Sequence, residues 1–159
     1  MNKILIIYLF LLTFVLSSCN TNENNTQSSI IKSTNTTSEA LEMNLLLKID
    51  GNILDVNWEK NDSVNELKEL AKNTLTINMH EYGGFEQTGS IGKSIKRNDS
   101  QINVIPGDIV LYNGNAISVF YNSSSWSYTK LGHINLDNNE LNNILNKSNV
   151  TFVLELANN

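Results

Sequence analysis

The amino-acid sequence predicts a mainly β domain built from about eight short strands and a pair of short helices. Asp50-Gly51-Asn52 and Asn113-Gly114-Asn115 each lie between two apolar runs, and these residue types tolerate the positive φ of a tight hairpin turn. Apolar and polar residues alternate in Thr74–His80 and in Val150–Leu156, which is the period of a half-buried strand. Because closing a sheet removes its exposed edges, a β-barrel is the architecture we expect.

The first half of the domain is predicted to be a hairpin, a helix and a strand. Strands are expected at Leu45–Ile49 and Ile53–Trp58, followed later by Thr74–His80. The helix is expected to begin at Asp62-Ser63, because Ser63 and Glu66 have the spacing of a capping box. Four apolar residues then share one helical face: Val64, Leu67, Leu70 and Ala71.

The second half is predicted to be a long irregular segment, a β-meander, a helix and a last strand. Glu81–Ser100 is rich in glycine and polar residues, which favours an excursion without regular structure. The elements expected after it are strands at Gln101–Ile105, Ile109–Tyr112 and Ala116–Tyr121, a polar loop at Asn122–Ser125, a strand from Trp126 to Ile134, a helix opened by the capping box of Asp137 and Glu140, and the strand Val150–Leu156. In Ala116–Tyr121, alternation predicts that one of Phe120 and Tyr121 faces the core and the other the outer surface.

The first 42 residues are predicted to export and anchor the domain. Residues 1–18 have a basic start at Lys3 and an apolar run, Ile4–Val15, which is shorter than the roughly 20 residues that span a bilayer. Leu16-Ser17-Ser18-Cys19 resembles the bacterial lipobox, in which the peptide is cut before the cysteine and the cysteine is acylated. An ordinary secretory signal is the alternative, but Cys19 is the only cysteine, which favours lipidation.

A lipidated Cys19 makes the membrane a predicted partner and places the protein in the cell envelope, outside the cytoplasm. Residues 19–42 consist largely of Asn, Ser and Thr and are predicted to form a disordered tether. The folded domain is expected to span residues 43–157.

Charge and motifs exclude several classes of function. The formal net charge is −5 and no basic patch is visible, which argues against nucleic acid as a partner. His80 and His133 are too few and too scattered to predict a metal site. The segment Gly89–Ser94 faintly resembles a phosphate loop, but position 87 is glutamine where that motif needs glycine. No cofactor is therefore predicted.

Three segments in order resemble the small prokaryotic cyclophilin-like domain family: Glu81-Tyr82-Gly83-Gly84-Phe85-Glu86-Gln87, Pro106-Gly107-Asp108-Ile109-Val110-Leu111-Tyr112 and Trp126-Ser127-Tyr128-Thr129-Lys130-Leu131-Gly132. This resemblance implies a closed eight-stranded β-barrel with two helices over residues 43–157. Members of the family mostly have no assigned activity.

The resemblance also raises peptidyl-prolyl isomerisation as an alternative activity, acting on exported proteins. Carried onto this chain, the Gly-Phe pair of true cyclophilins is Gly84-Phe85, their arginine falls on His80 and their glutamine on Thr88, with Gln87 one place early. The barrier to peptide-bond rotation is roughly 18–20 kcal/mol, and a guanidinium offers a permanent charge and a fixed fork of donors that an imidazole does not. The only arginine is Arg97, in a polar segment. We therefore expect binding without catalysis.

The predicted binding site is a shallow groove beside Phe85 that would take an extended peptide or a small apolar ligand. Its expected residues are His80, Tyr82, Phe85, Glu86, Gln87, Tyr112, Trp126 and Tyr128. Packing in the core is the alternative for each aromatic residue. His80 and Glu81, joined by Glu86, also suggest a general base, whereas the alternative for His80 is the polar face of its strand. No catalytic residue and no oligomeric state are predicted.

Overall fold

The computed structural model describes residues 43–158. The predicted signal peptide, the lipidated Cys19 and the tether lie outside this range. Neither helix in the described part of the chain is long and apolar enough to cross a membrane.

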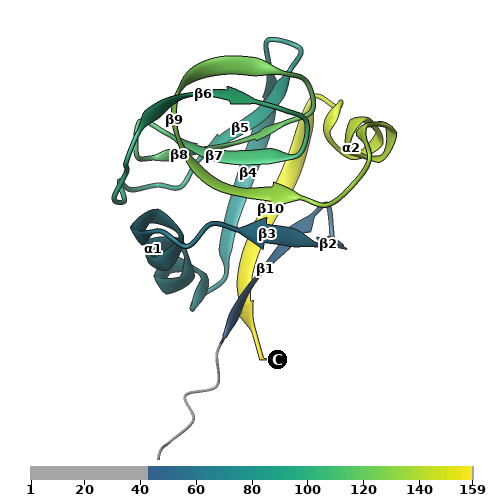
Figure 1. Ribbon diagram of the computed structural model, residues 1–159. Helices are drawn as coiled ribbons and strands as arrows, with labels where there is room; N and C mark the ends of the chain where they lie inside the picture. Colours follow the sequence, from purple (N-terminus) through teal and green to yellow (C-terminus); the bar gives the residue numbers. More distant parts are fainter. Residues whose placement is uncertain (1–42, 159) are drawn as a thin grey trace, which may run out of the picture. The chain divides into compact units, whose positions relative to one another are not determined.

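The described residues form ten strands and two helices (Figure 1). In chain order these elements are β1 (Asn44–Ile49), β2 (Asn52–Leu54), β3 (Val56–Trp58), α1 (Asp62–Ala71), β4 (Leu75–Tyr82), β5 (Glu86–Ser90), β6 (Ser100–Val104), β7 (Asp108–Tyr112), β8 (Ala116–Phe120), β9 (Ser124–Ile134), α2 (Asn138–Leu145) and β10 (Asn149–Ala157).

The strands make one curved antiparallel sheet in the order β2-β1-β10-β4-β5-β8-β7-β9-β3. The two ends of this path, β2 and β3, follow each other in the chain and are separated only by Asp55. The Trp58 indole N–H donates to the carbonyl oxygen of Leu45 at 2.8 Å, which ties β3 back to β1. The sheet is therefore a nearly closed barrel, as predicted.

The described residues form ten strands, whereas about eight were predicted, and two differences between prediction and structure account for this. The expected strand Ile53–Trp58 is divided, because its first part pairs with β1 and its second part with β9. The prediction that Glu81–Ser100 is an irregular excursion is wrong, because β5 lies there between β4 and β8. Gly89 permits this close pairing, since a Cβ at that position would lie 2.6 Å from Ile77 Cγ2 and 3.0 Å from the carbonyl oxygen of Asn78.

The helix caps confirm one prediction and correct another. Asp137 and Glu140 form the predicted capping box of α2. The cap of α1 is Asn61, whose side chain accepts the amide of Val64 at 2.9 Å, so the capping box predicted for Ser63 is wrong. Ser63 is buried and donates to the carbonyl oxygen of Lys96 at 2.7 Å. Both helices bury apolar residues in the barrel core.

The sheet buries apolar residues on both of its faces. The main core lies inside the barrel, and Tyr121 belongs to it. A second cluster joins Val104, Val110, Phe120 and Tyr128, with Phe85 and Ile102 packed against it. The predicted alternation holds, because Tyr121 faces the barrel core and Phe120 the outer face. Phe120 is nevertheless buried, because the outer face of the sheet is covered at this point.

The second cluster is covered by a two-stranded ribbon, β6 with the first part of β9, that the sequence did not predict in full. β6 leaves the main path and pairs only with β9, and β9 begins at Ser124 rather than at Trp126. Figure 1 shows β6 and the first part of β9 curving over β7 and β8. Ser124 and Ser125 are thus strand residues, which corrects the loop predicted at 122–125.

Candidate functional site

A groove of about 520 Å³ lies on the outer face of the sheet, beside the second cluster. Its walls come from β4, β5, β7 and the first part of β9, together with the turn between β4 and β5. The residues that line it are His80, Tyr82, Phe85, Glu86, Thr88, Tyr112, Ser124, Ser125, Trp126 and Tyr128.

The antiparallel register places the polar groove residues side by side. Thr88 of β5 pairs with His80 of β4 and with Ser118 of β8. Glu86, two residues earlier, pairs with Tyr82 and Phe120. Directly paired residues project from the same face of a sheet, so these two rows share the outer face. The inner face of β5 carries Gln87 and Gly89.

Packed aromatic rings form and support one wall of the groove. The rings of Phe85 and Phe120 are parallel within 6°, with centroids 6.2 Å apart. Tyr128 packs edge-on against Phe120 at 5.6 Å and against Tyr112 at 6.0 Å. Tyr82 and Trp126 are 60% and 57% exposed. The groove therefore offers a rigid apolar wall and exposed aromatic rings for contact with a ligand.

The second feature of the groove, besides its aromatic wall, is the buried acid Glu86. Glu86 is only 7% exposed, and its Oε2 has no hydrogen-bond partner among the described residues. Burial raises the pKa of the Glu86 carboxyl above its ordinary value, and a hydrogen bond with Ser118 opposes part of the rise. Burial also raises the pKa of the Tyr128 hydroxyl, and the charge of Glu86 adds to that rise. A buried acid in a groove is a feature of functional sites.

A chain of hydrogen-bonded hydroxyl groups runs from Glu86 across the sheet. Ser118 Oγ donates to Thr88 Oγ1 at 3.0 Å. Thr88 Oγ1 in turn donates to the carbonyl oxygen of Ile117 at 3.4 Å. Each hydroxyl has a single proton, so the direction of this chain depends on whether Glu86 is protonated.

All but one of the predicted groove residues line the groove. The exception is Gln87, which is fully buried and whose amide donates to the carbonyl oxygens of Leu145 at 2.7 Å and Lys147 at 2.5 Å. Its placement in the groove was wrong, because in a strand it points to the face opposite Glu86. It instead joins the barrel to the end of α2.

Sequence reasoning missed Thr88, Ser124 and Ser125 as groove residues. Thr88 had one signal, because the glutamine position of true cyclophilins falls on it. His80, Phe85 and Thr88 all line the groove, so the positions onto which the isomerase signature falls do meet in one place. The two serines had no signal, since a run of serines is typical of a loop.

Glu81 does not join His80 at the groove. Its carboxylate accepts the amide of Gly84 at 2.5 Å and the hydroxyl of Tyr121 at 3.2 Å, so it holds the turn between β4 and β5. Nothing in this arrangement supports the general-base hypothesis for the pair.

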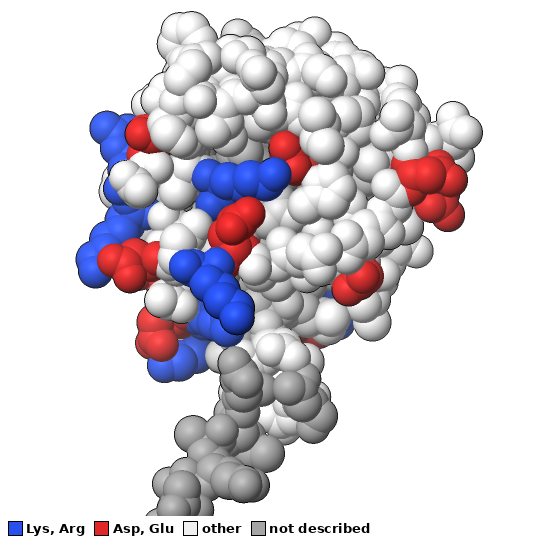
Figure 2. Space-filling model, viewed as in Figure 1, with Lys and Arg blue, Asp and Glu red and all other residues white. Residues whose placement is uncertain are grey.

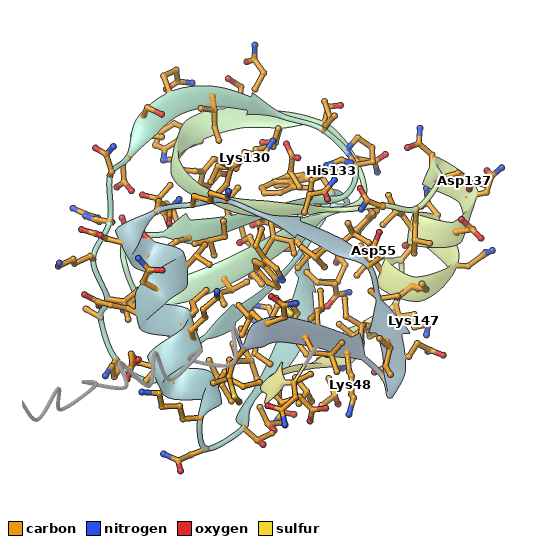
Figure 3. All side chains as sticks on the ribbon, turned by 60° about the horizontal axis from the view of Figure 1, so that its bottom comes forward. Lys48, Asp55, Lys130, His133, Asp137 and Lys147 are labelled. Atoms are coloured by element: carbon orange, nitrogen blue, oxygen red, sulfur yellow. The ribbon has the colours of Figure 1, made fainter. Side chains whose placement is uncertain are left out.

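A second polar cluster lies away from the groove, around the buried Asp108. Its Oδ1 contacts His133 Nδ1 at 2.8 Å and Lys130 Nζ at 3.0 Å, and its Oδ2 accepts the amide of Ile105 at 3.1 Å. Lys130 and His133, labelled in Figure 3, both come from β9. Among residues 43–158, no three His, Cys, Asp or Glu side chains gather where they could hold a metal ion.

The barrel and its outer groove define a small β-barrel domain of the cyclophilin type. Residues 47–155 match the model of the cyclophilin-like family, and the chain belongs to this family. No curated protein matches the chain.

Proposed function

We propose that this protein is a membrane-anchored lipoprotein whose groove binds a peptide or a small ligand through an apolar group, without catalysing prolyl isomerisation. The observation that carries the proposal is the packed cluster of Phe85, Phe120 and Tyr128 beside an open groove. Full enclosure of an apolar side chain is worth roughly 1.5–3 kcal/mol. Phe120 is already fixed beneath the other rings, so the wall loses little freedom when a ligand binds.

The composition of the groove argues against isomerase activity. Isomerisation needs a donor that interacts more strongly with the twisted peptide than with the planar one. Of the residues that the structure describes, none lining the groove is lysine or arginine. His80 occupies the arginine position of the isomerase signature, and a neutral imidazole is a weaker donor than a guanidinium.

We predict that the purified protein does not accelerate cis–trans exchange of a proline peptide in a protease-coupled assay. Acceleration by the wild type that Phe85→Ala abolishes would establish the isomerase function and contradict the proposal. His80→Arg is the companion variant, because it restores the charged donor at that position. Activity in His80→Arg alone would show that the missing guanidinium limits catalysis.

Anchoring rests on the sequence around Cys19, where small residues precede the only thiol of the chain. Acylation adds about 0.8 kcal/mol per buried CH₂, so several chains hold the protein stably at a membrane. We expect the wild type to incorporate labelled palmitate and to partition into the detergent phase. Cys19→Ser is expected to lose both properties, and equal labelling of the two proteins would contradict lipidation.

A further inference from the structure

We propose that the groove binds an alkylammonium group, carried by a free amine or by a lysine side chain, with the Glu86 carboxylate as its counter-ion. This inference rests on the proposed binding function and names the class of ligand. The alkyl part would lie along the aromatic wall and the ammonium would reach the acid.

The first argument is the unsatisfied oxygen of Glu86. A buried carboxylate oxygen that lacks a donor is unfavourable, and native proteins leave few such atoms. Glu86 Oε2 is one of these atoms. Oε2 is itself covered in the free protein, but Glu86 lines the open groove, so a small movement of its side chain would bring the carboxylate to a ligand bound there. An ammonium has three donors and no acceptor, which suits this oxygen.

The second argument is that, of the described residues, no lysine or arginine lines the groove beside Glu86. The titratable groups that line the groove with Glu86 are His80 and Tyr82 from β4, Tyr112 from β7 and Tyr128 from β9. Tyr121, which follows β8, is also close to Glu86, since burial raises the pKa of its hydroxyl and the charge of Glu86 adds to that rise. Ser118 and Phe120 of β8 are uncharged, as is all of β6. Between residues 100 and 129 the only charged residue is Asp108, which is buried in the other cluster.

The surface around the groove is also poor in positively charged side chains. Figure 2 shows most lysine and arginine side chains on the side of α1 and acidic side chains on both sides of the molecule, whereas the uppermost surface, over β6, carries no charged side chain in this view. A cation entering the groove therefore meets aromatic rings, hydroxyl groups, the His80 imidazole and one acid. Faces of Phe, Tyr and Trp attract cations through their quadrupoles, and Tyr82, Phe85, Trp126 and Tyr128 all line the groove.

The third argument is the chain of hydroxyl groups, which allows Glu86 to change charge without losing its partner. When Glu86 is protonated it can donate to Ser118, which donates to Thr88 and onward to the carbonyl oxygen of Ile117. When Glu86 is ionised, Ser118 can turn its one proton toward the carboxylate. The free groove favours the neutral acid because of burial, and an ammonium favours the anion.

Binding of the ammonium should therefore release the Glu86 proton to solvent wherever the free acid is still protonated. The expected affinity for an amine rises as the pH passes through the raised pKa of Glu86 and then stays level. It falls again only near about pH 10.4, where an alkylamine itself loses its proton.

The test compares charged and neutral probes on the purified full-length protein. The free probes are n-butylamine and 1-butanol, and the peptide probes are blocked Ala-Lys-Ala and blocked Ala-norleucine-Ala. Titrations followed by the NMR shifts of Trp126 and of the β5 amides, over a pH series from about 4 to 9, measure each affinity. We expect a cationic probe to bind at least roughly tenfold more tightly than its neutral partner at neutral pH.

Glu86→Gln keeps the size of the side chain and removes the charge. We expect it to weaken amine binding roughly tenfold and to abolish both the pH dependence and the proton release seen by calorimetry. Glu69→Gln is the matched control, because it removes the same charge from the exposed surface of α1. It should bind the amine as the wild type does.

The outcomes distinguish failure of the ammonium inference from failure of the proposed binding function. Binding by Ala-Lys-Ala alone would make a lysine side chain the ligand, whereas equal binding by butylamine would make a free amine sufficient, and both support the inference. Neutral probes that bind as tightly as cations, or unchanged amine binding in Glu86→Gln, would overturn the inference and leave the apolar groove intact. If no probe shifts any groove signal, the inference and the proposed binding function both fail.

Discussion

Asp108→Ala is expected to lower the free energy of unfolding by about 3 kcal/mol. Asp108 is 2% exposed, and it holds three groups: the Ile105 amide, His133 Nδ1 and Lys130 Nζ. Its removal leaves the Ile105 amide without its acceptor and takes a charged partner from two residues of β9. Both β9 side chains can still reach water, which keeps the loss below that of a fully buried pair.

Urea denaturation at neutral pH measures this loss, and an exposed ion pair supplies the control. Glu69 and Lys72 pair on the surface of α1 with more than half of each side chain exposed. Glu69→Ala should change the free energy of unfolding by no more than about 0.5 kcal/mol. If Asp108→Ala costs as little as Glu69→Ala, the Asp108 cluster does not stabilise the barrel.

Where the sequence pattern is strict, it predicted the fold well. Apolar and polar residues alternate in Thr74–His80 and, apart from Val153, in Val150–Leu156, and these segments form the strands β4 and β10 of the barrel. Asp137 and Glu140 formed their capping box because its requirements are local. These elements need only a few neighbouring residues to specify them.

β5 could not be predicted, because its residues suit a loop and become a strand only between two partners. Its sequence is Glu-Gln-Thr-Gly-Ser, in which the glycine is required by the approach of Ile77 and the glutamine by the end of α2. Tertiary contacts of this kind override local propensity. The same cause explains Gln87, whose role depends on a helix almost sixty residues away.

The candidate site was predicted in its residues but not in its chemistry. Aromatic residues next to the Gly84-Phe85 pair indicated a groove, and Phe85, Trp126 and Tyr128 do line one. Glu86 pairs with Phe120 of β8 and lies beside the cluster to which β6 and β9 contribute, and no local pattern indicates either neighbour. The burial of Glu86 and its unpartnered oxygen were therefore recognised only in the structure.

Gly107→Ala is expected to lower the free energy of unfolding by about 3 kcal/mol, for two separate reasons. Its φ is +93°, a conformation that side chains other than glycine rarely adopt. In addition, a Cβ at this position would lie 2.9 Å from the carbonyl oxygen of Ile134 and 2.9 Å from His133 Cε1. The backbone oxygen cannot move freely, because β9 is held at this point by β3.

Gly51→Ala separates the two contributions. Gly51 has a similar φ of +83°, but an added Cβ would meet nothing within 4 Å. Gly51→Ala should lower the free energy of unfolding by about 1 kcal/mol, which is the cost of the backbone conformation alone.

Gly107 also donates its amide to the carbonyl oxygen of Phe120 at 2.8 Å, so a displacement of Gly107 would reach the aromatic wall of the groove. We therefore expect Gly107→Ala, but not Gly51→Ala, to change the near-ultraviolet circular dichroism of the folded protein. Equal costs for the two variants would show that the crowding at Gly107 is relieved by small movements. An unchanged near-ultraviolet spectrum in Gly107→Ala would show that the turn is not coupled to the groove.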